Sequence, residues 1–333
     1  MTVISMQSSP PRSSAAPAWP TKLDLLGVGI SPTTYDEAVQ LILDAAKQGR
    51  PAVVACQAVH AVVTAGGDPE LRRRVNSFEL VTPDGQPVRW AINWFYRAGL
   101  AERVYGPELM LRVCREAAVR GVAIYLYGGT PEVLARLRRR LIGACPGLKI
   151  AGSESPPFRA LTEDEDRQVL ERINASGARL VFVGLGCPKQ DHFAYEHRER
   201  LAAVQLCVGA AFDFHAGVKP MAPRWMQRHG LEWLFRLGCE PRRLASRYLV
   251  TNTLFVTKLA GAIAGHAVGW LGQKPAALGA VSPRDAVGWR CPGGEPAGAS
   301  PRPPVSFDQT HARGSAPATA VNVYEHQSME TQL

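Results

Sequence analysis

The chain has 333 residues, of which 46% are apolar and 20% charged, with Lys+Arg 38 against Asp+Glu 29 and a formal net charge of +9. This composition suits a packed core in one large or two small domains, and it excludes fibrous, collagen-like and wholly disordered chains. The cysteines are odd in number, form no CxxC pair and mostly lie in apolar runs. They indicate reduced thiols rather than a disulfide framework or a zinc site. No apolar run follows a basic start at the N-terminus, so we expect no secretory signal.

Both ends of the sequence are rich in small residues and proline. Residues 1–21 and 273–333 are predicted to be disordered on this composition. The folded part is predicted to consist of a core over 22–220 and a basic, aromatic, helical appendage over 221–272.

Within the core, short apolar or β-branched runs alternate with amphipathic segments. Strands are predicted at 23–27, 52–55, 78–82, 122–127, 148–151, 180–183 and 205–208. Helix starts are predicted at capping boxes beginning at Thr34 and Thr162, and at Asp68 and Thr130, each followed by proline. This alternation predicts an α/β fold, a mostly parallel sheet with helices on both faces. Ligands of such sheets bind at the carboxyl ends of the strands.

A Pro-Asp-Gly turn follows the predicted strand at 78–82 and places the carboxylate of Asp84 where that strand ends. The start of the next helix favours an ionised carboxylate, so Asp84 is a candidate general base. The same residues also suit a purely structural turn. Spacing alone leaves both interpretations open.

Two further strand ends carry glycine turns. Gly128-Gly129 before Thr130 exposes backbone N–H groups to an anion, although a ligand-free βα turn is the alternative. The stretch from Gly184 to Gln190 adds a lysine and an amide. It is not a dinucleotide fingerprint, because the third glycine of that pattern falls on Lys189, and a dehydrogenase is therefore disfavoured.

Two other polar groups have competing interpretations. Asp213 and His215 follow the strand at 205–208 and are candidates for acid–base or hydroxyl-binding roles, but a structural role is favoured for His215 among its aromatic neighbours. Asp164 and Asp166 formally form a D-x-D metal motif in the first turn of a predicted helix. Acids there complement the helix dipole, so we expect no metal ion.

The segment from Arg224 to Lys258 mixes basic and aromatic residues, which suits lipid headgroups or phosphates. Nucleic acid is a disfavoured partner, because no helix-turn-helix, zinc-finger or RNP-like sequence accompanies the segment. Lys258 and His266 interrupt the apolar stretch at 247–271. It therefore predicts a helix lying in the interface of an anionic membrane surface, with peripheral attachment, rather than a spanning one.

These motifs together resemble the WecG/TagA/CpsF glycosyltransferases (glycosyltransferase family 26), in order from about residue 24 to about residue 250. The resemblance is carried by Thr82-Pro-Asp84-Gly85, Arg103-Val-Tyr-Gly106-Pro-Glu-Leu-Met110, Tyr127-Gly128-Gly129, Gly184-Leu-Gly186-Cys-Pro188-Lys-Gln190-Asp191, Gly209-Ala-Ala-Phe-Asp213-Phe-His-Ala-Gly217 and Ala222-Pro-Arg224-Trp225-Met-Gln227.

The resemblance implies a Rossmann-like core without metal or cofactor and a C-terminal appendage that completes the active site. The implied reaction is an inverting transfer of a hexose from a UDP-sugar to a sugar linked to polyprenyl diphosphate. It takes place on the cytoplasmic face of the inner membrane, in exopolysaccharide or other cell-envelope polysaccharide synthesis. Whether the chain forms a homo-oligomer is left open.

The resemblance also implies roles for individual residues. Asp84 is the general base and Gln190 lies at the nucleotide-sugar site, to which we also assign Gly128, Gly129, Thr130, Gly184, Gly186, Pro188 and Asp213. The diphosphate and the acceptor are expected at Gln57, Arg236, Arg243 and Arg247. Without a metal ion, guanidinium groups must neutralise the charge that builds on the leaving phosphate.

The sequence departs from the family pattern at Gln57, where members often have Asn, and at Gln86, where Ile or Met often follows the Asp-Gly turn. Both positions are expected near the sugar. They favour glucose over N-acetylmannosamine or its uronic acid, as in the branch that adds the second glucose in xanthan-type exopolysaccharides. The alternative function is a non-catalytic nucleotide-sugar-binding module that regulates or scaffolds a membrane assembly.

Overall fold

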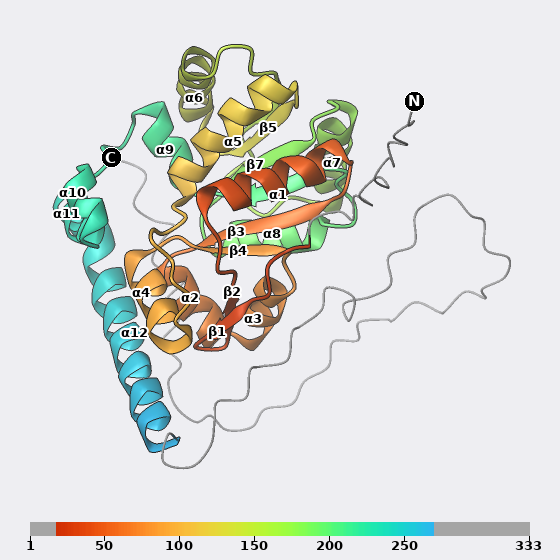
Figure 1. The fold of residues 1–333 in the computed structure, drawn as a ribbon. Coiled ribbons are helices and arrows are strands. Elements are labelled where there is room, and N and C mark those ends of the chain that lie inside the picture. Colours follow the sequence, from red (N-terminus) through yellow and green to blue (C-terminus); the bar gives the residue numbers. More distant parts are fainter. Residues whose placement is uncertain (1–17, 270–333) are drawn as a thin grey trace, which may run out of the picture. The chain divides into compact units, whose positions relative to one another are not determined.

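The computed structural model of the chain describes residues 18–269 (Figure 1). The disorder predicted for 1–17 and 273–333 lies outside the described residues. Residues 18–21, also predicted to be disordered, belong to the folded part, because Trp19 packs against a buried apolar cluster. Burial of this large side chain outweighs the Ser/Pro/Ala composition around it.

A parallel sheet of six strands forms the centre of the fold, in the order β4-β3-β8-β7-β5-β6. The strands are β3 (Ala52–Gln57), β4 (Leu80–Pro83), β5 (Ile124–Gly128), β6 (Ile150–Glu154), β7 (Leu180–Gly184) and β8 (Val204–Cys207). All neighbours pair in parallel. The predicted α/β, Rossmann-like class is confirmed, and the carboxyl ends of all these strands meet at one edge.

The predicted strand at 23–27 does not join this sheet. β1 (Leu23–Leu25) and β2 (Val28–Ile30) form a separate antiparallel hairpin. The turn residues Leu26 and Gly27 have φ values of 57° and 87°, as a two-residue hairpin turn requires. Because the chain reverses after three residues, the strand predicted at 23–27 is shortened to Leu23–Leu25 and lies outside the parallel sheet.

Helices cover both faces of the sheet. One face carries α1 (Tyr35–Lys47), α5 (Gly106–Arg120), α6 (Pro131–Ala144) and α9 (Ala211–Ala216). The other carries α2 (Val59–Gly67), α3 (Pro69–Asn76), α4 (Gln86–Tyr96), α7 (Glu163–Ala175) and α8 (Lys189–His197).

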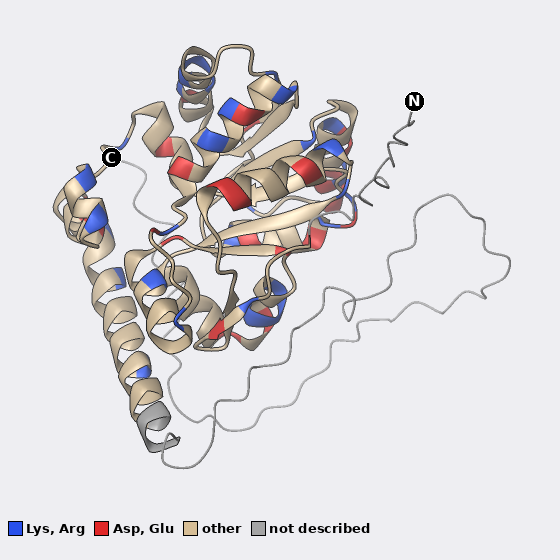
Figure 2. Ribbon diagram, in the orientation of Figure 1, with Lys and Arg blue, Asp and Glu red and all other residues tan. Residues whose placement is uncertain are grey.

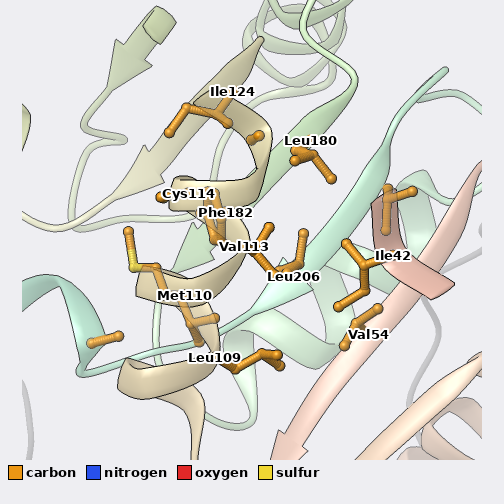
Figure 3. Close-up of a cluster of buried hydrophobic side chains, with 14 of the residues drawn as sticks. Ile42, Val54, Leu109, Met110, Val113, Cys114, Ile124, Leu180, Phe182 and Leu206 are labelled. Atoms are coloured by element: carbon orange, nitrogen blue, oxygen red, sulfur yellow. The ribbon is translucent and has the colours of Figure 1, made fainter. Parts of the chain in front are cut away.

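Alternate side chains of each strand point to opposite faces of the sheet and pack in the apolar clusters on both sides. Val54 of β3 joins the cluster under α1 and α5, with Ile42 and Met110 (Figure 3). Its neighbours Val53 and Ala55 join the cluster under α2, α3 and α4. A strand buried on both faces in this way is typical of a parallel sheet, which explains why these runs are continuously apolar.

The predicted caps are largely confirmed. Asp68, Thr130 and Thr162 each accept a hydrogen bond from a backbone N–H in the first turn of the following helix. Thr162 completes its capping box with Glu165. The box at Thr34 is incomplete, because the Glu37 carboxylate accepts from the hydroxyl of Thr33 instead.

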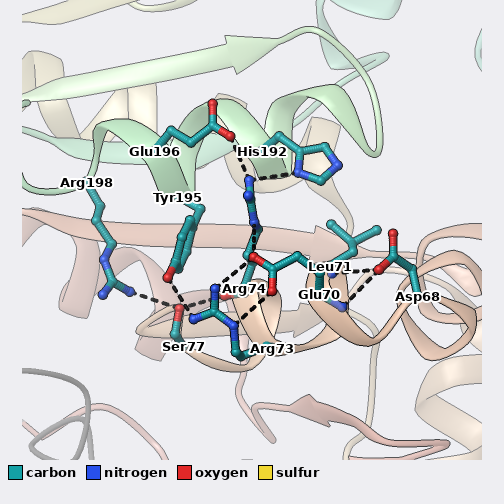
Figure 4. A network of polar contacts seen from close by, with 10 residues as sticks. All are labelled: Asp68, Glu70, Leu71, Arg73, Arg74, Ser77, His192, Tyr195, Glu196 and Arg198. Carbon is teal, nitrogen blue, oxygen red and sulfur yellow. Dashed lines mark hydrogen bonds and ion pairs between the residues drawn. The ribbon is translucent and has the colours of Figure 1, made fainter. Parts of the chain in front are cut away.

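A polar network joins α3 to α8 at the surface (Figure 4). Arg74 lies 2.7 Å from the Glu196 carboxylate and also pairs with Glu70, while Arg73 donates to the Tyr195 hydroxyl at 2.9 Å. The network holds α8 against α3, and the first turn of α8 carries Gln190.

Three helices lie within the range predicted for the appendage, 221–272, of which 270–272 are outside the described residues. They are α10 (Arg224–Arg228), α11 (Glu232–Cys239) and α12 (Pro241–Gly269). α12 packs along α2, with Leu244 and Phe255 buried. In the described part of the chain, no helix combines the length and the apolar character that a bilayer span needs.

Candidate active site

The predicted site residues come from four strands that end at the same level. Gln57 is the last residue of β3, and its register partner in β4 is Pro83, directly before Asp84. Gly128 and Gly184, the last residues of β5 and β7, are also register partners. The fold therefore brings the predicted base and the predicted glycine turns to one edge of the sheet.

Asp84 is held in place by backbone contacts. Its N–H donates to the Gln57 carbonyl at 3.3 Å, and the Gly106 N–H donates to its Oδ2 at 2.8 Å. A Cβ at Gly106 would lie 3.1 Å from the same oxygen, so glycine allows this close approach. Burial raises the pKa of Asp84, against the lowering effects of the Arg103 charge and the Gly106 bond. Asp84 is thus a fixed carboxylate with more proton affinity than a solvated one.

A buried ion cluster lies beside Asp84. Glu232 of α11 accepts from Arg103 at 2.6 Å and from the Tyr105 hydroxyl at 2.8 Å. Arg236 binds the same carboxylate and lies 3.2 Å from the Tyr105 oxygen. Burial opposes ionisation of Glu232, but the Arg236 and Arg103 charges outweigh it and lower the pKa of this carboxyl. Arg236, predicted at the diphosphate, is therefore engaged by an acidic partner.

No role was predicted from the sequence for Arg103, Tyr105 or Glu232. The first two lie in one of the segments that carry the family resemblance, which was the only signal for them. Glu232 lies in a predominantly basic segment, and nothing in the local sequence distinguishes it as a site residue.

A second polar group surrounds Asp191 at the start of α8. Gln57 donates to the Asp191 carboxylate at 3.3 Å. Burial raises the pKa of Asp191 to about 7, even though hydrogen bonds from Cys187 and Gln57 act to lower it. The Gln190 Oε1 lies nearby, against Gly209, where a Cβ would stand 3.2 Å from it. Gln57, at the end of β3, thus contacts Asp191 in the first turn of α8, the turn that also carries Gln190.

Several buried acceptors at this edge have no hydrogen-bond partner among residues 18–269. They are Gln57 Oε1, Gln86 Oε1, Gln190 Oε1 and Asp191 Oδ2. Buried acceptors are normally satisfied in folded proteins. A ligand that donates hydrogen bonds would satisfy the acceptors that lie at the strand ends.

The two glycine turns lie against each other. A Cβ at Gly128 would stand 2.7 Å from the Gly184 carbonyl carbon, and one at Gly184 would stand 2.6 Å from the Phe212 ring. Packing alone therefore explains glycine at these two positions. Thr130 caps α6, and Pro188 occupies the N-cap position of α8, so the starts of both helices lie at the same edge.

Asp213 and Arg243 are joined through two intermediate ions. Asp213 pairs with Lys219 at 3.2 Å, and Lys219 pairs with Glu240 at 3.4 Å. Glu240 also binds Arg243. The structure thus ties α9 to the end of α11, with Arg243 and Asp213 both engaged.

Arg247 differs from the other two predicted arginines. Its side chain is partly buried and forms no ion pair or hydrogen bond within the described part of the chain. Burial and the neighbouring charge of Arg243 lower its pKa. Burial, aided by the Arg247 charge, also lowers the pKa of His60 in α2 to about 4. Among the described residues, Arg247 is therefore a partly buried cation with no acidic partner.

The structural interpretation of His215 is confirmed, because its Nε2 donates to the Pro107 carbonyl at 2.7 Å. Asp166, of the D-x-D sequence, pairs with His197 at 2.8 Å and with Arg200 at 3.1 Å. Across 18–269, no group of three or more His, Cys, Asp or Glu residues is placed to hold a metal ion. The cysteines of that range are free, and Cys239 is exposed rather than buried.

A comparison with known protein families matches residues 23–267 to the Glycosyl transferase WecG/TagA/CpsF family. The matched range contains the whole sheet, the Asp84 turn, the Glu232 cluster and most of α12. Every site residue described above lies within it. The chain therefore belongs to the WecG/TagA/CpsF family and is a glycosyltransferase of cell-envelope polysaccharide synthesis.

Proposed function

We propose that this glycosyltransferase is an inverting enzyme that moves glucose from UDP-glucose to a sugar linked to polyprenyl diphosphate. One observation carries the proposal. Asp84 is fixed by the Gly106 N–H at 2.8 Å, at the edge where the strands end, with its pKa raised by burial. A fixed carboxylate with increased proton affinity suits a general base.

In the proposed reaction, Asp84 takes the proton from the acceptor hydroxyl. The hydroxyl oxygen attacks the anomeric carbon of the donor from the face opposite the diphosphate. The bond between that carbon and the diphosphate oxygen breaks, its electron pair goes to the β-phosphate, and the configuration is inverted. Charge on the leaving UDP therefore has to be stabilised as the bond breaks.

Arg247 is the best placed of the three predicted arginines to stabilise that charge. It has no acidic partner among the described residues, and an anion beside it would offset the repulsion from Arg243 that lowers its pKa. Arg236 and Arg243 are each paired with a glutamate, Glu232 and Glu240, which weakens their attraction for phosphate.

The unpaired acceptors support a neutral hexose as the donor sugar. Gln57, Gln190 and Asp191 present buried oxygens that sugar hydroxyls would satisfy. A uronic acid would bring a third carboxylate close to Asp84 and Asp191, and burying like charges together is costly. Glucose is therefore preferred over the uronic acid.

The appendage supports peripheral attachment to the cytoplasmic face of the inner membrane. The charged residues of α12 are all basic, as Figure 2 shows: Arg242, Arg243, Arg247 and Lys258. Leu249, Val256 and Ile263 are exposed and lie seven residues apart, close to two helical turns, so they form one apolar stripe. Basic charge with such a stripe suits an anionic membrane interface.

The proposal is tested by a donor screen with the full chain. Radiolabelled UDP-glucose, UDP-N-acetylmannosamine and its uronic acid are each incubated with polyprenyl-diphosphate-linked monosaccharides. We expect label in the lipid fraction with UDP-glucose. No transfer with any donor, together with tight UDP binding, would instead indicate the non-catalytic binding module.

A further inference from the structure

The segment 103–106 is bonded on one side to the end of β4. The Val104 N–H donates to the Pro83 carbonyl at 3.1 Å, and the Thr82 hydroxyl donates to the Val104 carbonyl at 3.2 Å. The next bond in this direction is that of the Gly106 N–H to Asp84, at 2.8 Å. The position of this segment therefore determines where the Asp84 carboxylate is held.

The same segment is bonded on its other side to α11. Arg103 and Tyr105 both donate to Glu232, one to each carboxylate oxygen, at 2.6 and 2.8 Å. Arg103 and Glu232 are each 8% exposed, so water hardly competes for these bonds. Tyr105 and Gly106 are adjacent, and one binds Glu232 while the other binds Asp84.

We propose that Glu232 is a positioning residue that couples the seating of α11 on the core to the placement and charge of Asp84. The role of Asp84 as base rests on the proposed function, but the coupling itself does not. The unit consists of Glu232, the segment 103–106 and Asp84. When α11 is seated, Glu232 holds this segment and also keeps two arginines occupied beside the base.

The charges around Asp84 give this unit a distinct electrostatic effect. Arg103 and Arg236 lower the pKa of Asp84, whereas Glu232 raises it. Three other titratable groups interact electrostatically with Asp84: Tyr35 of α1, Cys56 of β3 and Tyr105. Burial raises the pKa of each of them. Glu232 is therefore the acidic group that opposes the two cations.

Glu232→Gln is the informative substitution, because it keeps the shape of the side chain and removes its charge. The two arginines then lose their counter-ion and act on Asp84 without opposition, so the pKa of Asp84 falls. Glu232→Asp keeps the charge on a shorter arm and is the conservative rescue. Trp233→Ala is the matched control: it disturbs the contact of α11 with Tyr248 and leaves all charges in place.

The first measurement is hydrogen exchange of the full chain by mass spectrometry, which needs no substrate. Glu232→Gln is expected to speed exchange in peptides over α11 and over 103–110 together. Trp233→Ala, which leaves the bonds of Glu232 to Arg103 and Tyr105 in place, is expected to leave exchange over 103–110 at the wild-type rate. Unchanged exchange over 103–110 in Glu232→Gln would overturn the coupling, whatever the reaction of the enzyme is.

The second measurement is the pH dependence of glucose transfer from UDP-glucose. The acidic limb of kcat is expected to move to lower pH in Glu232→Gln, because the pKa of Asp84 falls, with a fall in the plateau of about 10- to 100-fold. Glu232→Asp should return the limb towards that of the wild type, and Trp233→Ala should leave it in place. Transfer by the wild type with an identical limb in Glu232→Gln would overturn the positioning role while leaving the proposed function intact.

Discussion

Asp191 is a buried acid whose ionisation opposes folding. Burial raises its pKa from 3.8 to about 7, so the folded chain holds this proton between about pH 4 and pH 7 while the unfolded chain has released it. Stability from this group is fully present below about pH 4 and is lost as the pH rises through 7. The raised pKa corresponds to about 4 kcal/mol at most.

The substitution Asp191→Asn should remove this pH dependence. The free energy of unfolding of the variant, relative to the wild type, is expected to rise between pH 4 and pH 7 and then to level off, because an amide does not titrate there. Denaturant titrations at intervals of pH measure it. A constant difference between the two proteins over this range would contradict the placement of a protonated Asp191 beside Gln57.

The sequence predicted candidate site residues but not the residues that contact them. Asp84 was identified because it directly follows a predicted strand, whereas Gln57 and Gln190 were assigned through the family resemblance. The pairing of Arg103 with Glu232 spans 129 residues. No local pattern contains such a contact, so the engagement of Arg236 by Glu232 could not be predicted.

At the scale of single elements, the sequence predicted helix starts, which depend on the chemistry of one capping side chain. It did not predict the hairpin, which depends on backbone conformation. Caps such as those at Thr130 and Thr162 follow from a side chain and the turn beside it. The hairpin of β1 and β2 depends on the left-handed conformation of Leu26, which a leucine rarely adopts. The apolar run at 23–27 therefore gave no sign of the reversal.

Helix α12 carries Arg243 and Arg247, two of the three arginines predicted at the diphosphate. Arg247→Ala should cost about 2 to 4 kcal/mol of transition-state stabilisation, because it removes a cation that has no acidic partner in the described structure. Arg242→Ala, on an exposed position of the same helix, is the matched control and should change kcat/KM little. Steady-state kinetics with a soluble acceptor analogue measure both.

If Arg247→Ala, Arg236→Ala and Arg243→Ala all retain full activity with that analogue, the arginines do not bind the diphosphate. Their basic charge would then serve in membrane attachment.

At the scale of the whole molecule, we expect the exposed surface of α12 to determine how the protein partitions between water and lipid. The exposed stripe of Leu249 and Val256 lies on the helix that carries only basic charge. The double substitution Leu249→Gln and Val256→Gln should reduce sedimentation with phosphatidylglycerol vesicles by about tenfold, through lost burial of apolar area. Transfer to a soluble acceptor should stay unchanged.

Phosphatidylcholine vesicles and high salt are the controls for the charge contribution, and both should weaken binding of the wild type. Binding that withstands alkaline carbonate, or that is the same for both lipids, would contradict an electrostatic, interfacial attachment.

The most direct test of the account is the turnover of Asp84→Asn. The amide keeps the size of the side chain and an oxygen for the Gly106 N–H, which binds Asp84 at 2.8 Å, but it cannot take a proton from the acceptor. With UDP-glucose and a lipid-linked monosaccharide, turnover should fall by ~10² or more, while UDP binding measured by calorimetry stays at the wild-type level. Turnover close to that of the wild type in this variant would contradict Asp84 as the general base, and with it the proposed mechanism.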